Sequence, residues 1–140
     1  GAWPQFRDEE WSGAYQLSPL PVWDAARRMR RGMFHETARG AEGAMVCVSF
    51  HWTKTLGIQQ GGAILLDSTE PRDWLRRARF DGRREGVAPK DDSFDMLGWH
   101  CYMSPEIAAA GLVRLAALHD DNPDLPNDPY PDLSQAEVFK

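Results

Sequence analysis

Lys54 is the residue of this chain with the most distinctive chemistry. It lies in residues 49–62, S-F-H-W-T-K-T-L-G-I-Q-Q-G-G, and is the only lysine among the first 89 residues, where every other basic side chain of the Lys/Arg type is arginine. A lysine amine, unlike a guanidinium group, can lose its proton, attack a carbonyl and form a Schiff base. The alternative is a solvated surface charge, which is the usual state of a loop lysine. The surrounding sequence must decide between the two.

The stretch around Lys54 resembles the cofactor-lysine segment of the DegT/DnrJ/StrS-type sugar aminotransferases, which are pyridoxal-phosphate enzymes of fold type I. The resemblance rests on the pattern S-F-x-x-x-K-x-L, the glycine pair at 61–62 and the apolar run that follows. Three further stretches match the family in the same order: V-W-D-A-A at 22–26, a helix ending in Gly-Arg at 74–83, and L-G-W-H-C-Y-M-S at 97–104. The resemblance covers roughly residues 20–118.

This resemblance implies a site for pyridoxal 5'-phosphate (PLP). It gives Lys54 the Schiff-base and proton-transfer role, and places Asp24 beside the ring nitrogen, where a carboxylate favours the protonated form. It sets Ala26 against the ring face and Ser49 on the phosphate, to which a hydroxyl can donate. Each position also has a structural interpretation, because Asp24 could cap a helix and Ser49 could bond the backbone at a strand end.

The chain also departs from the family pattern. His100 stands where the family has an asparagine that reaches the phosphate in the neighbouring subunit, Tyr102 stands at an arginine, and Arg27 at a glutamine. An imidazole can still donate to a phosphate, so His100 is kept as a cofactor-binding candidate, with a half-buried loop histidine as the alternative. The family's phosphate-cradling turn and ring-stacking aromatic have no match before Trp23, and its smaller C-terminal domain has none after residue 118. The resemblance is therefore to the middle portion of such an enzyme, as a fragment or a reduced relative.

The hydrophobic pattern predicts an α/β fold, namely part of a fold type I PLP-transferase large domain with a mixed, mostly parallel sheet and flanking helices. Strands are expected near Val22, Val48 and Ile64. Helices are expected after Asp24 as far as Gly32, over 71–80 and over 105–118, with loops at 3–21 and 35–43. The last helix is expected to bury an apolar stripe, whose members are Ile107, Ala108, Leu112, Leu115 and Ala116.

Charge divides the chain in two. Residues 1–118 carry 15 basic and 15 acidic side chains, whereas residues 119–140 carry six acids and one lysine, together with four of the ten prolines. We predict a partial PLP-transferase-like large domain at 1–118 and an acidic, proline-rich arm at 119–140, either solvated or packed on a partner subunit. The four arginines within 27–31 lack the aromatic interleaving of a nucleic-acid patch, so they are expected to form a solvated helix face or to pair with the acidic arm.

Several classes of protein are disfavoured by composition. No apolar run approaches the ~18 residues needed to cross a membrane, and no signal segment opens the chain, which begins Gly-Ala-Trp as a trimmed or tagged chain would. Two cysteines do not make a disulfide framework, so a cytoplasmic location is expected. The four histidines show no metal-ligand spacing, and no metal is predicted.

The function that these features favour is a PLP-dependent aminotransferase acting on a keto-sugar nucleotide with an amino donor. The alternative is a catalytically incomplete fragment or relative that keeps the sheet for binding or assembly. Neither a nucleic acid nor a membrane is expected as partner. A homodimer is expected, because a truncated sheet leaves an unpaired edge and a core face that a second copy would cover.

Overall fold

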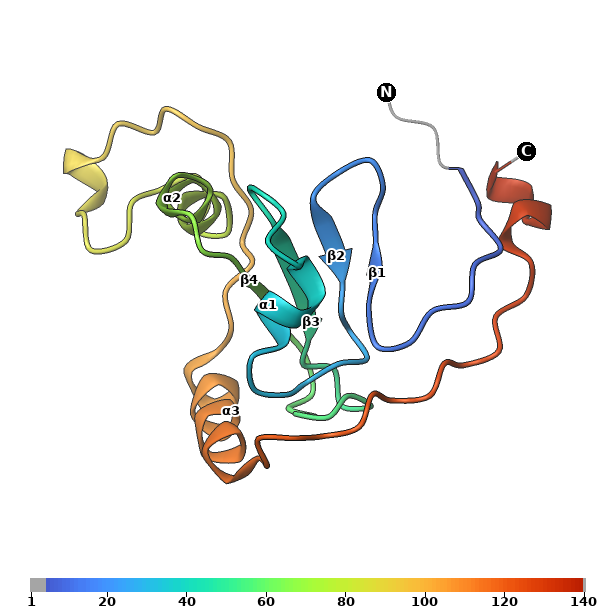
Figure 1. Ribbon diagram of the computed structural model, residues 1–140. Coiled ribbons are helices and arrows are strands. Elements are labelled where there is room, and N and C mark those ends of the chain that lie inside the picture. The colour runs from blue at the N-terminus through green and yellow to red at the C-terminus, as the bar shows by residue number, and fades with distance from the viewer. Residues whose placement is uncertain (1–4, 140) are drawn as a thin grey trace.

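The computed structural model describes residues 5–139 and contains one four-stranded sheet in the order β1-β2-β3-β4 (Figure 1). The strands are β1 (Tyr15–Gln16), β2 (Val22–Asp24), β3 (Met45–Ser49) and β4 (Gly62–Leu65). The three predicted strands are confirmed, whereas β1 lies in a stretch predicted to be loop. Only β2 and β3 pair in parallel; β1 and β4 each pair antiparallel. The sheet is mixed as expected, but the expectation that it is mostly parallel is wrong, because a simple return loop brings β4 back antiparallel to β3.

Three α-helices accompany the sheet: α1 (Met33–Ala38), α2 (Thr69–Ala78) and α3 (Pro105–Ala117). Short 3-10 turns are η1 (Pro89–Asp91), η2 (Leu133–Gln135) and η3 (Glu137–Phe139). The helices expected at 71–80 and 105–118 are confirmed within two residues. Ser104 caps α3, since its side chain accepts a hydrogen bond from the Ile107 N–H.

The helix predicted after Asp24 is wrong. Residues 25–32 form turns and irregular backbone. Helix α1 begins at Met33, directly after the expected helix end at Gly32, and extends into the loop expected at 35–43. Gly32, with φ 73°, precedes the first helical residue instead of following the last. The physical reason lies in the side chains of Asp24 and the arginines. Asp24 accepts a hydrogen bond from the Ala26 N–H and closes a turn there, and the arginines bond to aspartates far along the chain.

The main core lies between α1 and β3. Its buried residues are Ala25, Met33, Ala38, Ala44, Val46 and Val48. The alternating burial of β3 shows that one face of that strand meets the core.

The apolar stripe predicted on α3 is wrong: Leu112 and Leu115 are 69% and 49% exposed, and the buried residue of this helix is Gly111.

The first part of the acidic arm packs against residues 27–31 of the same chain. We call residues 119–130 the acidic strap; it has no regular secondary structure and runs from α3 along the sheet end of the molecule towards the N-terminal stretch (Figure 1). Backbone hydrogen bonds join it to residues 27–31, from Leu125 N to Arg27 O (2.8 Å) and from Arg31 N to Asp120 O (2.7 Å). The pairing of the arginines with the acidic arm is confirmed, since Arg27, Arg28 and Arg31 form ion pairs with aspartates of the strap. Trp3, the first tryptophan of the loop expected at 3–21, lies outside the described residues.

None of the helices between residues 5 and 139 has the length and apolar character that spanning a lipid bilayer requires.

Candidate functional site

Two of the predicted site residues end neighbouring parallel strands. Asp24 is the last residue of β2 and Ser49 the last of β3, in a register that pairs Asp24 with Cys47. Parallel strands present their carboxyl ends at the same edge of a sheet. Ala26 follows β2 at this edge, and the loop that carries Lys54 follows β3. The fold therefore brings four of the five predicted residues to one edge of the sheet.

The Asp24 carboxylate is held through both oxygens. Its Oδ1 accepts a hydrogen bond from the Ala26 N–H at 2.9 Å, and its Oδ2 accepts one from the Tyr15 hydroxyl at 3.1 Å. The helix cap considered as the alternative for Asp24 is wrong, because no helix follows it; the carboxylate closes a turn at Ala26 instead. Tyr15 stands opposite Asp24 in the β1–β2 register. Burial raises the pKa of the Tyr15 hydroxyl, and the neighbouring Asp24 charge and hydrogen bond raise it further.

The Lys54 loop is closed by its own backbone. The N–H of Phe50 donates to Gly61 O at 2.9 Å, that of Ile58 to Phe50 O at 3.0 Å, and that of Lys54 to His51 O at 2.8 Å. Leu56 and Ile58 are each 5% exposed, so two apolar side chains anchor the loop on either side of Gly57. Gly57 has φ 55°, and a Cβ there would stand 3.1 Å from the Lys54 carbonyl oxygen, which makes glycine the fitting residue.

Helix α3 supports this loop from outside. The Arg114 guanidinium donates to the carbonyl oxygens of Leu56, at 3.3 Å, and of Gly57. Gly111 lets the helix approach closely, since a Cβ at this position would be 2.9 Å from Ile58 Cδ1. Sequence reasoning missed the role of Arg114. The available signal was that Arg114 is the only cation of the helix.

The groups at this sheet edge offer three kinds of chemistry. Within residues 5–139, no hydrogen bond or ion pair engages Nζ of the half-buried Lys54. Ser49 Oγ accepts a hydrogen bond from the His51 N–H at 3.3 Å, so the backbone bond considered for this serine exists and its own O–H stays available as a donor. A carboxylate and a hydroxyl thus stand at the carboxyl ends of β2 and β3, and the amine is carried by the loop that follows β3. No group of three or more His, Cys, Asp or Glu side chains in the described part of the chain gathers as a metal site.

His100 stands on a different part of the molecule. It pairs through its backbone with Phe80 just after α2, its Nδ1 lies 3.7 Å from Asp81 Oδ1, and its ring centroid is 3.9 Å from that of Tyr102. The side chain is 68% exposed, so the alternative of a half-buried loop histidine is wrong. His100 therefore does not share the elements that position the other four residues.

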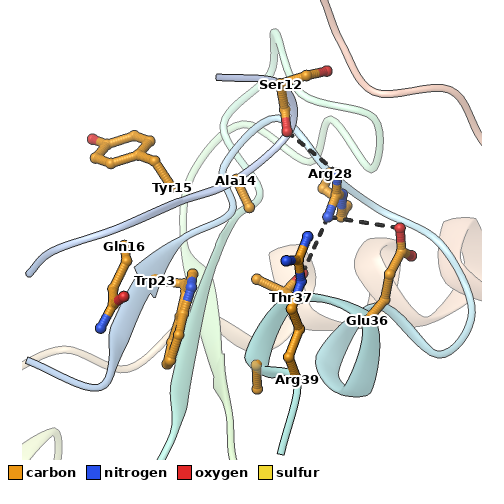
Figure 2. Close-up of a pocket in the computed structure, with 10 residues that line it drawn as sticks. Ser12, Ala14, Tyr15, Gln16, Trp23, Arg28, Glu36, Thr37 and Arg39 are labelled. Atoms are coloured by element: carbon orange, nitrogen blue, oxygen red, sulfur yellow. Dashed lines mark hydrogen bonds and ion pairs between the residues drawn. The ribbon is translucent and has the colours of Figure 1, made fainter. Parts of the chain in front are cut away.

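Two hollows lie beside the sheet. A groove of about 910 Å³ is mostly apolar and is lined by β4, α2, Trp99 and residues 101–103. A smaller, more polar cavity of about 320 Å³ lies between β1, β2 and α1, where Figure 2 shows Arg28 linked to Ser12, Thr37 and Glu36. None of the five predicted site residues lines either hollow.

Comparison with known proteins agrees with these features. The family model described as the DegT/DnrJ/EryC1/StrS aminotransferase family matches residues 20–123, a range that contains all five predicted site residues. No curated protein and no solved structure matches the chain. Since the matched range takes up most of the 140 residues, the chain belongs to the DegT/DnrJ/EryC1/StrS aminotransferase family.

Proposed function

We propose that this chain carries the cofactor-lysine part of a PLP-dependent aminotransferase, with Lys54 as the reactive amine and a keto-sugar nucleotide as the acceptor of the amino group. The observation that supports this most directly is the shared sheet edge of Asp24, Ser49 and Lys54. The membership of the family supports the reaction class.

The donor set at that edge fits PLP chemically. When bound, PLP supplies an electron sink that requires a protonated ring nitrogen. The Asp24 carboxylate would keep that nitrogen protonated, and its two hydrogen bonds, from Ala26 and Tyr15, fix its plane beforehand. The hydroxyl of Ser49 would donate to a phosphate oxygen while still accepting from the His51 N–H. Ala26 would leave room for a flat ring because it has no side chain beyond Cβ.

Lys54 is suited to the proton-transfer role. Its Nζ has no competing hydrogen bond or ion pair within residues 5–139, so the amine would be available to hold PLP and, once released from it, to accept and return a proton. The closed backbone of its loop and the Arg114 contacts hold the lysine backbone at the sheet edge. Positioning of this kind is what a shuttling base needs.

A second copy would complete this site. Among the described strands, β4 pairs only with β3 and so keeps one open edge. We propose a homodimer of partial fold type I large domains in the cytoplasm, in which His100 serves the phosphate of the neighbouring subunit's site. The position of His100 away from the Asp24 edge agrees with a role in trans.

One observation favours a different function. Neither of the two hollows described above is lined by Asp24, Ser49 or Lys54, whereas small-molecule sites are usually concave. A domain that binds or assembles without chemistry is therefore the second candidate.

The test is the absorbance spectrum of the chain after incubation with PLP, compared with Lys54→Ala and with the matched control Lys90→Ala. We expect a new near-visible band in the wild type and in the control, lost in Lys54→Ala. Borohydride reduction should then attach the cofactor covalently to the peptide that contains Lys54, with a mass gain of PLP minus one water plus two hydrogens. An unchanged spectrum in all three proteins would leave the binding or assembly domain as the function.

A further inference from the structure

The most highly charged cluster of the chain plays no part in the proposed reaction. Four arginines lie within residues 27–31, which we call the arginine segment, and the segment has no helix that could spread them apart. Guanidinium groups so close together repel one another and need counter-charges. The question is which anion this segment is built to hold.

The chain's own acidic strap supplies the present counter-charges. Three aspartates spaced four residues apart each meet a different arginine: Arg31 Nη1 is 2.8 Å from Asp120 Oδ2, Arg28 Nη2 is 2.6 Å from Asp124 Oδ2, and Arg27 pairs with Asp128. The flanking aspartates are 74% and 68% exposed, so charge contributes more than burial to holding the strap at these points.

The central contact has the form of an oxyanion site. Arg28 holds the Asp124 carboxylate through Nε at 2.9 Å and Nη2 at 2.6 Å, which is the paired geometry that arginine uses for carboxylate and phosphate alike. Both side chains are 13% exposed. The carboxylate sits against Gly13, where a Cβ would come within 2.2 Å of Asp124 Cγ. We call the space between Arg28 and Gly13 the seat; it admits a compact anion such as this carboxylate.

The same arginine also opens onto the polar cavity of about 320 Å³. Arg28 and Arg39 both line it, and Arg28 further donates to Thr37 Oγ1 and to the Ser12 carbonyl oxygen, each at 3.3 Å (Figure 2). An anion that enters this cavity reaches Arg28 while the strap is still in place. The one carboxylate on the cavity wall is that of Glu36, whose Oε1 lies 2.5 Å from Arg30 Nη2 and 3.8 Å from Arg28 Nη1, so its shorter contact is with Arg30.

The strap is a competitor that a ligand can displace. A tethered segment acts at an effective concentration on the order of millimolar. A multiply charged ligand at a similar concentration can therefore exchange with it. Phosphate suits this exchange better than a single carboxylate, because it carries more charge and more acceptor oxygens.

We propose that the arginine segment is a binding site for phosphate-bearing anions, which the acidic strap fills as an internal competitor and from which such an anion displaces it. This site is separate from the proposed PLP chemistry and does not depend on it.

Titration calorimetry with inorganic tripolyphosphate tests the site. The wild type is compared with Asp124→Asn, which weakens the competitor, and with Asp132→Asn, which removes the same charge from a residue bonded to Ser134 instead of an arginine. We expect Asp124→Asn to bind tripolyphosphate about tenfold more tightly than the wild type, and Asp132→Asn to match the wild type. Equal affinity of all three proteins would overturn the proposal.

Hydrogen exchange of the folded wild type provides a test that needs no variant. We expect tripolyphosphate to increase deuterium uptake in residues 119–130, and no such increase would also overturn the proposal.

A steric variant adds an independent check. The new Cβ of Gly13→Ala expels Asp124, whereas that of the control Gly43→Ala meets open space; the two glycines have similar φ values, 68° at Gly13 and 67° at Gly43. Gly13→Ala should raise strap exchange, and Gly43→Ala should leave it near the wild-type level; identical exchange in the two would count against the seat.

Discussion

Among single residues, Tyr15 shows how closely Asp24 is held. The pKa of Tyr15 is raised first by burial, and then by the charge of Asp24 and the hydrogen bond to it. Asp24→Asn removes the charge, so we expect the pKa of Tyr15 to fall towards its ordinary value of 10.0 while the burial contribution stays. The measurement is an ultraviolet titration of tyrosinate.

Tyr15→Phe identifies which of the three tyrosines produces that transition. The chain also contains Tyr102 and Tyr130, so the titration of Tyr15→Phe gives the background to subtract. If the subtracted Tyr15 curve were the same in Asp24→Asn and in the wild type, the hydroxyl would not be bonded to this carboxylate.

At the same scale, sequence reasoning found the residues that carry a recognisable pattern. Asp24, Ser49 and Lys54 were identified by spacing and resemblance, and the parallel pairing of β2 and β3 gathers them. Tyr15 could not be found in this way, because β1 is only two residues long and has no alternation to detect. Whether these residues hold PLP stays a prediction.

Among the elements, helices α2 and α3 both have a serine at the N-cap, but we expect the two serines to differ in their effect on stability. Ser104 accepts a hydrogen bond from the Ile107 N–H at the start of α3, whereas the Ser68 side chain makes no cap bond to α2. We expect Ser104→Ala to lower the free energy of unfolding by about 1 kcal/mol. Ser68→Ala serves as the matched control with a smaller effect, and urea unfolding followed by circular dichroism measures both. A larger loss in Ser68→Ala would contradict the assignment of the caps.

Helix prediction succeeded where local signals decide and failed where distant contacts do. Local start and stop signals in the sequence placed α2 and α3 within two residues. The helix expected after Asp24 is absent because the arginines bond to aspartates about 90 or more residues away, a cause that no local window contains. The stripe of α3 was misassigned for a similar reason, since this helix meets the Lys54 loop through Gly111 and leaves Leu112 exposed.

For the whole molecule, the strap connects the two ends of the described chain. Asn127 donates to the Trp11 carbonyl oxygen at 2.9 Å, and the rings of Phe6 and Phe139 lie 4.9 Å apart. These contacts close a long stretch of chain around the sheet. The unequal distribution of charge between 1–118 and 119–140 was visible in the sequence, and so was the possibility that the arginines pair with the arm. The contact of Asp124 with Gly13 could not be predicted, because a sequence does not show which side chain packs against a glycine.

The ion pair of Arg28 and Asp124 makes this closure depend on pH. The hydrogen bond from Arg28 holds the pKa of Asp124 below its ordinary value of 3.8, although burial opposes the shift. A depressed carboxylate pKa adds stability that is fully present above the unfolded value and is lost as the pH falls through the folded one. We therefore expect Asp124→Asn to be about 2 kcal/mol less stable than the wild type near neutral pH, and this difference to shrink as the pH drops below about 4. Urea unfolding at a series of pH values measures it, with Gly43→Ala as a control whose backbone strain does not titrate. A difference that stayed constant down to about pH 2 would show that Asp124 does not hold the strap through its charge.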